Sequence, residues 1–162
     1  MNDDDWNERT RGESEQERVD RNLLELLQEL RVAQTGVQIL FAFLLTLPFT
    51  QRFTKVSAFQ KDVYFVTLLL AAASTAFIIA PVAHHRILFR RHDKAHLVEV
   101  SNRFAIAGLV CLALAMTGAI LLITDVLFHD AVVVATTAAT AAIFGVIWFV
   151  EPLLRRWDGG RQ

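Results

Sequence analysis

Four long apolar stretches follow one another along the chain, at about residues 32–49, 63–83, 104–124 and 131–150. Each holds 18 to 21 residues, and at a rise of about 1.5 Å per residue a helix of that length spans a hydrocarbon layer of roughly 30 Å. The connections between them are short, which makes neighbouring helices antiparallel. The pattern therefore predicts an all-α fold, a four-helix transmembrane bundle with up-down-up-down topology.

The chain before these stretches has a different character. Its first twenty residues carry eight acidic and three basic side chains, with almost nothing apolar beyond Trp6 and Val19. A segment of this composition cannot bury enough apolar surface to offset the entropy lost on ordering. We therefore expect residues 1–21 to be a disordered acidic tail and residues 22–157 to form the four-span transmembrane domain.

The distribution of lysine and arginine predicts the orientation. Thirteen of the 16 basic residues lie in the N-terminal segment, in the connection at residues 84–103 or after the last span, and only Arg52, Lys55 and Lys61 lie on the other side. Basic residues near the ends of spans favour the cytoplasmic side. The sequence thus predicts a multi-pass protein of the inner or plasma membrane with both termini in the cytoplasm.

Composition narrows the possible functions. The chain is 54% hydrophobic, and its one cysteine, Cys111, excludes an intrachain disulfide and a cysteine-based zinc site. No nucleophile-base pair, glycine-rich phosphate loop or pair of carboxylates occurs. We therefore expect a non-enzymatic protein without a cofactor or bound metal. Its expected partner is the lipid bilayer, and we expect no binding of nucleic acid.

Small residues recur one helical turn apart in three spans, a spacing that lets helix backbones approach closely. They are Ala72, Ala76 and Ala80; Ala107 and Cys111; Ala115 and Ala119; and Ala135, Ala138, Ala139, Ala142 and Gly145. They fit packing within the bundle, or a subunit interface of a homo-oligomer through the last helix. Pro81 is expected to end or bend the second helix.

The centres of the four spans contain no ionisable residue. The segments in question are Leu40–Phe43, Ala72–Thr75, Leu112–Ala115 and Ala139–Ala142. A titrating group near the membrane midplane is typical of proton and sodium carriers, so its absence argues against transport of that kind.

Polar residues concentrate at the cytoplasmic boundary instead. Gln28, Arg31, Thr35 and Gln38 follow a 3-4-3 spacing that places them on one helical stripe. Gln38 lies roughly 9 Å inside the first apolar stretch, so it should face another helix or a water-filled cavity. Together with possible partners these residues form a predicted polar collar: Glu25, Gln28, Glu29, Arg31, Gln34, Gln38, Arg86, Glu99, Asn102, Arg103 and Glu151. The collar either fixes the register of the bundle or lines a cytoplasmic vestibule or docking site.

The connection at residues 84–103 carries four histidines, His84, His85, His92 and His96. His92 and His96 are four residues apart and could place two imidazoles on one helical face for a metal, with Asp93 or Glu99 as a third ligand. The basic character of the segment favours contact with anionic lipid headgroups instead.

Three motifs resemble a known family. "NLLELLQELRVAQTGVQILFAFLLTLPF", "APVAHHRILFR" and "SNRFAIAGL" are similar to an uncharacterised four-span integral membrane protein family of high-GC bacteria, a domain of unknown function, over about Asn22 to Val150. Members of that family are sometimes labelled sodium:proton antiporters. We expect a protein that self-associates or docks a partner through the collar. The resemblance implies an alternative, a small ion transporter or channel subunit.

Overall fold

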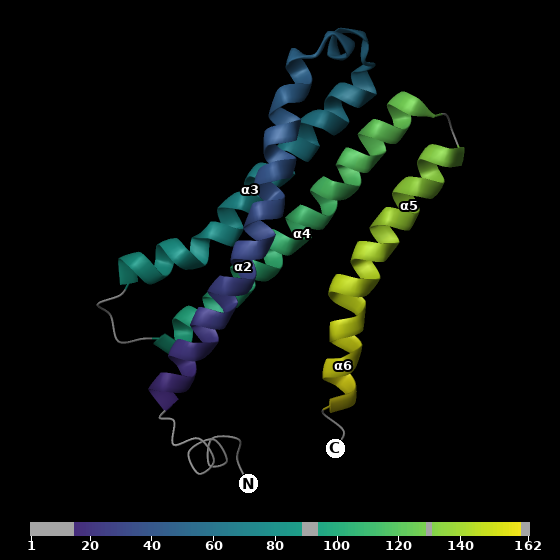
Figure 1. Ribbon diagram of the computed structural model, residues 1–162. Helices are drawn as coiled ribbons and strands as arrows, with labels where there is room; N and C mark the ends of the chain where they lie inside the picture. The colour runs from purple at the N-terminus through teal and green to yellow at the C-terminus, as the bar shows by residue number, and fades with distance from the viewer. Residues whose placement is uncertain (1–14, 89–93, 129–130, 160–162) are drawn as a thin grey trace.

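The computed structural model describes residues 15–88, 94–128 and 131–159, which are helical almost throughout (Figure 1). The elements are α2 (Glu15–Thr46), the short 3-10 helices η1 (Leu47–Phe49) and η2 (Gln51–Lys55), α3 (Ala58–Leu88), α4 (Lys94–Leu127), α5 (Ala131–Gly145), the π-helical turn η3 (Val146–Val150) and α6 (Glu151–Gly159). Because α5, η3 and α6 are continuous, they form one rod. The predicted all-α four-helix fold is confirmed.

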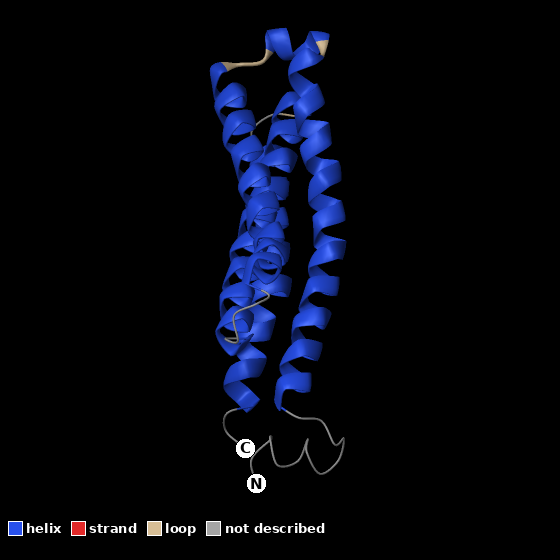
Figure 2. Ribbon diagram, turned by 90° about the vertical axis from the view of Figure 1, so that its left-hand side faces the viewer, coloured by secondary structure: helices blue, strands red, loops and turns tan. Residues whose placement is uncertain are grey.

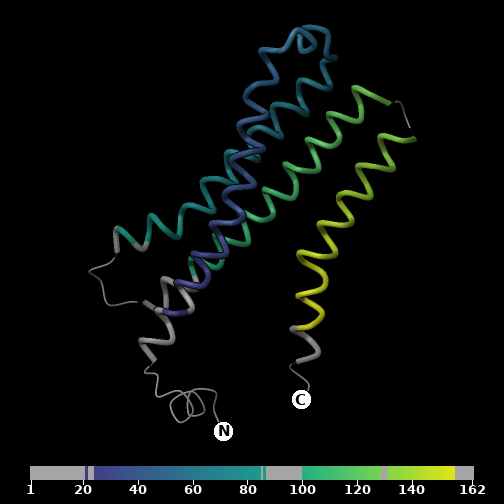
Figure 3. The backbone as a smooth tube through the Cα atoms, in the orientation of Figure 1, coloured from purple at the N-terminus to yellow at the C-terminus, as the bar shows by residue number. Residues whose placement is uncertain are grey.

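Four helical segments are long and apolar enough to cross a membrane. They are Leu24–Phe49, Ala58–His84, Val100–Leu127 and Ala131–Arg155, and each contains one of the apolar stretches read from the sequence. The chain is thus a multi-pass membrane protein. Figure 3 shows the two ends of the described chain at the same end of the bundle, as expected for an even number of spans.

The helices are longer than the sequence indicated. α2 begins at Glu15 and so includes residues 15–21, which were assigned to the tail; residues 1–14 lie outside the described chain, and their predicted disorder stays a prediction. Residues 84–103 were taken as a connection, but α3 runs on to Leu88 and α4 begins at Lys94. Polar residues at these ends extend each helix beyond its apolar span.

Pro81 lies inside α3 and does not end it, so that part of the prediction was wrong. A proline removes one backbone hydrogen bond, but transmembrane helices tolerate this where neighbouring helices surround the break. Pro81 is fully buried. The C-terminal part of α3 leaves the axis of the bundle, and its end lies apart from the ends of α2 and α4 (Figure 1).

The core lies between α2, α3 and α4. One cluster of buried side chains joins Leu30 and Val37 of α2 to Ile78 of α3 and to Ala105 and Leu112 of α4. A second cluster, nearer the other end, contains Leu44, Tyr64, Ala71, Ala115 and Leu122. Tyr64 of α3 is buried, and its hydroxyl donates to the Leu44 carbonyl at 3.1 Å.

The closest approach is between α3 and α4. A Cβ added at Gly108 would lie 2.7 Å from Ile78 Cγ1, and one at Gly118 would overlap the Thr67 hydroxyl. The buried Ser74 hydroxyl donates to the Gly108 carbonyl at 2.8 Å. Because these positions lack a side chain, the backbones can approach closely enough for a hydrogen bond between helices.

The rod of α5, η3 and α6 packs along α4 and lies to one side of α2 and α3 in the view of Figure 1, and Figure 2 shows that the described segments are helices and loops. Only 6% of the apolar window in this span is buried, against 33% in the α4 span. The π-helical turn ends at Val150, two residues before Pro152, and the Glu151 amide donates to the Val146 carbonyl. This wider turn fits a proline that cannot donate to the carbonyl four residues earlier.

Candidate functional site

Three apolar side chains determine which face of α2 packs against the rest of the bundle. Leu30, Val37 and Leu44 recur every seven residues and are 6%, 0% and 0% exposed. A seven-residue repeat keeps one helical face against its neighbours. This face packs on α3 and α4, so the remaining faces of α2 point away from the core.

The polar stripe of α2 consists of Gln28, Arg31, Thr35 and Gln38, and all four side chains are exposed on the single chain. The Thr35 hydroxyl is satisfied within its own helix, because it donates to the Arg31 carbonyl at 3.1 Å. Gln34 lies between the stripe and the core face and is half-buried. Within the described part of the chain, the amides of Gln34 and Gln38 form no hydrogen bond.

Gln38 lies nearer the middle of its helical span than the apolar stretch in the sequence suggested. The helical span runs from Leu24 to Phe49, so Gln38 is 14 residues from one end and 11 from the other. At 1.5 Å per residue, the shorter distance is about 16 Å, or half the thickness of a hydrocarbon core. The chain therefore presents an exposed amide near mid-span, and no other described helix of the same chain covers it.

The other predicted collar residues that the structure describes belong to several different surfaces. Glu25 and Glu29 are exposed on a different face of α2, Arg86 lies on the diverging end of α3, and Asn102 and Arg103 are exposed on α4. Glu151 forms an ion pair at 2.6 Å with Arg155, on its own helix, and both side chains are exposed. Exposed pairs of this kind add little stability. The side chain of Glu99 lies outside the described residues.

The predicted metal ligands are for the most part outside the described chain. This applies to His92 and Asp93 and to the side chains of His85, His96 and Glu99. Of the loop histidines, His84 is described: its Nδ1 lies 2.8 Å from the Ala80 carbonyl, and its ring packs on Phe104. Among the described residues, no three histidine, cysteine, aspartate or glutamate side chains come together.

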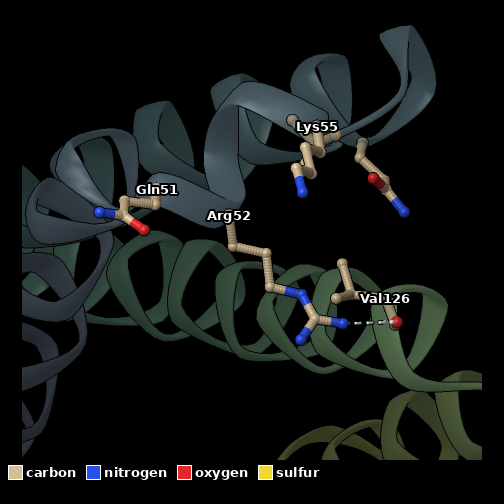
Figure 4. Close-up of a pocket in the computed structure, with 6 residues that line it drawn as sticks. Gln51, Arg52, Lys55 and Val126 are labelled. Carbon is tan, nitrogen blue, oxygen red and sulfur yellow. Dashed lines mark hydrogen bonds between the residues drawn. The ribbon is translucent and has the colours of Figure 1, made fainter.

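Sequence reasoning missed a site at the opposite end of the bundle. There Ser57 and Gln60 form a reciprocal cap of α3, with hydrogen bonds of 3.0 and 3.1 Å, and the Gln60 amide donates to Asp125 of α4 at 2.8 Å. This contact places η2 over the end of α4, and a cavity opens between them (Figure 4). The stretch "SAFQ" carries the capping-box pattern and was the available signal.

Comparison with known proteins bears on both ends of the molecule. Residues 12–152 match the family of unknown function DUF6328. The chain belongs to this family. The matched region of DUF6328 contains all of α2, with its polar stripe, and reaches just beyond η3.

Membership of DUF6328 confirms that the chain belongs to an uncharacterised family. No curated protein and no solved structure matches the chain. The function of this DUF6328 member must therefore be argued from its own residues.

Proposed function

We propose that this protein is a small, non-enzymatic membrane protein that self-associates in the bilayer through the polar stripe of α2. The observation that carries the proposal is Gln38, an exposed amide near mid-span without a hydrogen-bond partner in the described chain. An unpaired amide in an apolar medium is unfavourable by several kcal/mol, about 2–7 depending on the reference state. A neighbouring helix that pairs with it removes this penalty.

A second copy of the chain is the partner that fits Gln38 best. A primary amide has both an acceptor oxygen and donor hydrogens, so two glutamines related by a two-fold axis can satisfy each other. Most homo-oligomers use such self-complementary interfaces. Polar side chains that pair between transmembrane helices contribute about 0.6–2 kcal/mol, which is enough to bias a dimer when the helices are confined to a bilayer.

The outward face of α5 supports the same proposal independently. Ala135, Ala138 and Ala142 are exposed there, and a Cβ added at Gly145 would meet no atom within 4 Å. The alternative of packing within the bundle thus does not apply to these residues. A face of small residues lets a second helix approach closely, so α5 offers an additional contact surface between copies.

A cysteine cross-linking experiment tests the proposal. In a Cys111→Ala background, Gln38→Cys is expected to form disulfide-linked dimers on mild oxidation in native membranes, because two copies of this position face each other. The dimer fraction is measured by non-reducing electrophoresis.

Leu69→Cys provides the matched control. Leu69 is 52% exposed, lies eleven residues into the Ala58–His84 span and belongs to α3, so it samples random collisions at similar depth. Equal cross-linking of both variants, or none at Gln38→Cys, would overturn the proposal. A pH-gradient-driven flux in proteoliposomes that is lost in Glu29→Gln would instead support ion transport.

The proposed location is the inner or plasma membrane, with both termini in the cytoplasm, and it rests on the thirteen-to-three distribution of basic residues.

In the Cys111→Ala background, Thr54→Cys is expected to react with a membrane-impermeant maleimide in intact cells. Asn102→Cys should react only after permeabilisation. Both side chains are exposed and lie at opposite ends of the bundle, so the reverse pattern would invert the orientation.

A further inference from the structure

The cavity between η2 and α4 has a polar part and an apolar part. The polar part has a volume of about 570 Å³ and is lined by Gln51, Arg52, Lys55, Val56, Gln60 and Val126. An apolar cleft of about 200 Å³ continues from it and shares Arg52, Val56 and Val126. The two volumes together form one amphipathic groove, which we call the η2 groove.

Two cations point into the polar part. Arg52 and Lys55 extend from η2 toward α4 (Figure 4). One Arg52 nitrogen, Nη2, donates to the Val126 carbonyl at 3.4 Å, which anchors the guanidinium at the end of α4 and leaves its other N–H groups available. Within the described residues neither cation forms an ion pair. The nearby carboxylate of Asp125 accepts a hydrogen bond from Gln60.

The apolar part lies on the acyl-chain side of the boundary between lipid headgroups and acyl chains. Its walls include Phe53 of η2 and Leu122, Ile123 and Leu127 of α4, and the last of these residues ends the span Val100–Leu127. The polar part is formed by residues between the first and second spans, together with Gln60 and Val126 at the ends of the second and third spans. The groove thus runs from the depth of lipid headgroups into the depth of acyl chains.

We infer that the η2 groove binds an anionic glycerophospholipid from the leaflet opposite the termini. Its phosphate would pair with Arg52 and Lys55, since arginine and lysine both bind phosphate through charge-assisted hydrogen bonds. One acyl chain would lie against Phe53 and Ile123. Free phosphate would occupy only the polar part, and two cations favour a lipid with net negative charge over a zwitterionic one.

The test compares lipids added to the purified protein in detergent. Phosphatidylglycerol is expected to raise the melting temperature more than phosphatidylcholine does, and inorganic phosphate should have no effect. The double variant Arg52→Gln/Lys55→Gln should lose the preference, with roughly a 30-fold weaker apparent affinity for phosphatidylglycerol, given the contribution of each basic residue near an anionic surface.

Two further variants keep the test decisive. Lys61→Gln removes an exposed charge at the same end of the molecule but outside the groove, so the lipid preference should remain. Val126→Phe would narrow the shared wall while preserving the backbone carbonyl that anchors Arg52, and it should weaken lipid binding. Equal responses to both lipids would overturn the inference, and a response to phosphate alone would indicate a free-anion site. None of these variants changes α2, so the result is separate from self-association.

Discussion

Replacing Gly108 with valine is expected to disrupt the packing of α3 against α4. The Cβ alone would lie 2.7 Å from Ile78 Cγ1 and 3.3 Å from the Ile78 backbone nitrogen, and a branched side chain adds further overlap. Overpacking of this kind lowers stability by about 1–3 kcal/mol, and the loss of the Ser74 hydrogen bond adds roughly 0.6 kcal/mol. We expect a strong fall in melting temperature and in the monodisperse fraction on size-exclusion chromatography.

Gly36→Val is the matched control, because a Cβ at Gly36 meets no atom within 4 Å, and its melting temperature should change little. Ile78→Ala removes the side-chain atom that overlaps at Gly108. The double variant should therefore be more stable than the sum of the two single losses predicts. Strict additivity, or a stable Gly108→Val protein, would contradict the close approach of the two helices.

This glycine contact illustrates what a sequence pattern can and cannot predict in a membrane protein. The number of helices and their spans follow from apolar length alone, because a bilayer of fixed thickness requires it. Which face of α3, α4 or α5 is buried does not follow, since all faces of these spans are apolar. Ala115 and Ala119 do face the core, but on α3 the buried positions include Ala71, Ser74 and Ile78, whereas Ala76 of the predicted alanine repeat is exposed.

The candidate sites likewise include features that the sequence spacing predicts and features that depend on tertiary contacts. The spacing of Gln28, Arg31, Thr35 and Gln38 predicted a single stripe, and the structure places all four on one exposed face. The partners proposed for them were inferred from depth alone, which does not determine lateral position. The η2 groove was missed because it depends on the path of η2 across α4, and a tertiary contact between Gln60 and Asp125 fixes that path.

The substitution Gln38→Leu is expected to weaken self-association by roughly 5- to 30-fold, the range that corresponds to a hydrogen bond of about 1–2 kcal/mol between transmembrane helices. The isolated chain should be at least as stable as before, because leucine is better solvated by lipid than an unpaired amide is. Single-molecule photobleaching in supported bilayers measures the dimer fraction, and thermal unfolding in detergent measures the stability of the monomer.

Thr35→Val is the control for Gln38→Leu, since it removes a polar group from the same stripe. The Thr35 hydroxyl already donates to the Arg31 carbonyl of its own helix at 3.1 Å, so the dimer fraction should not change. Gln38→Asn keeps an amide and should retain part of the association. If Gln38→Leu instead lowers monomer stability and leaves the dimer fraction unchanged, the amide acts within one chain, and the stripe sets the register of the bundle. The two outcomes differ on both measurements, because a group paired between copies and a group paired within one chain contribute to different equilibria.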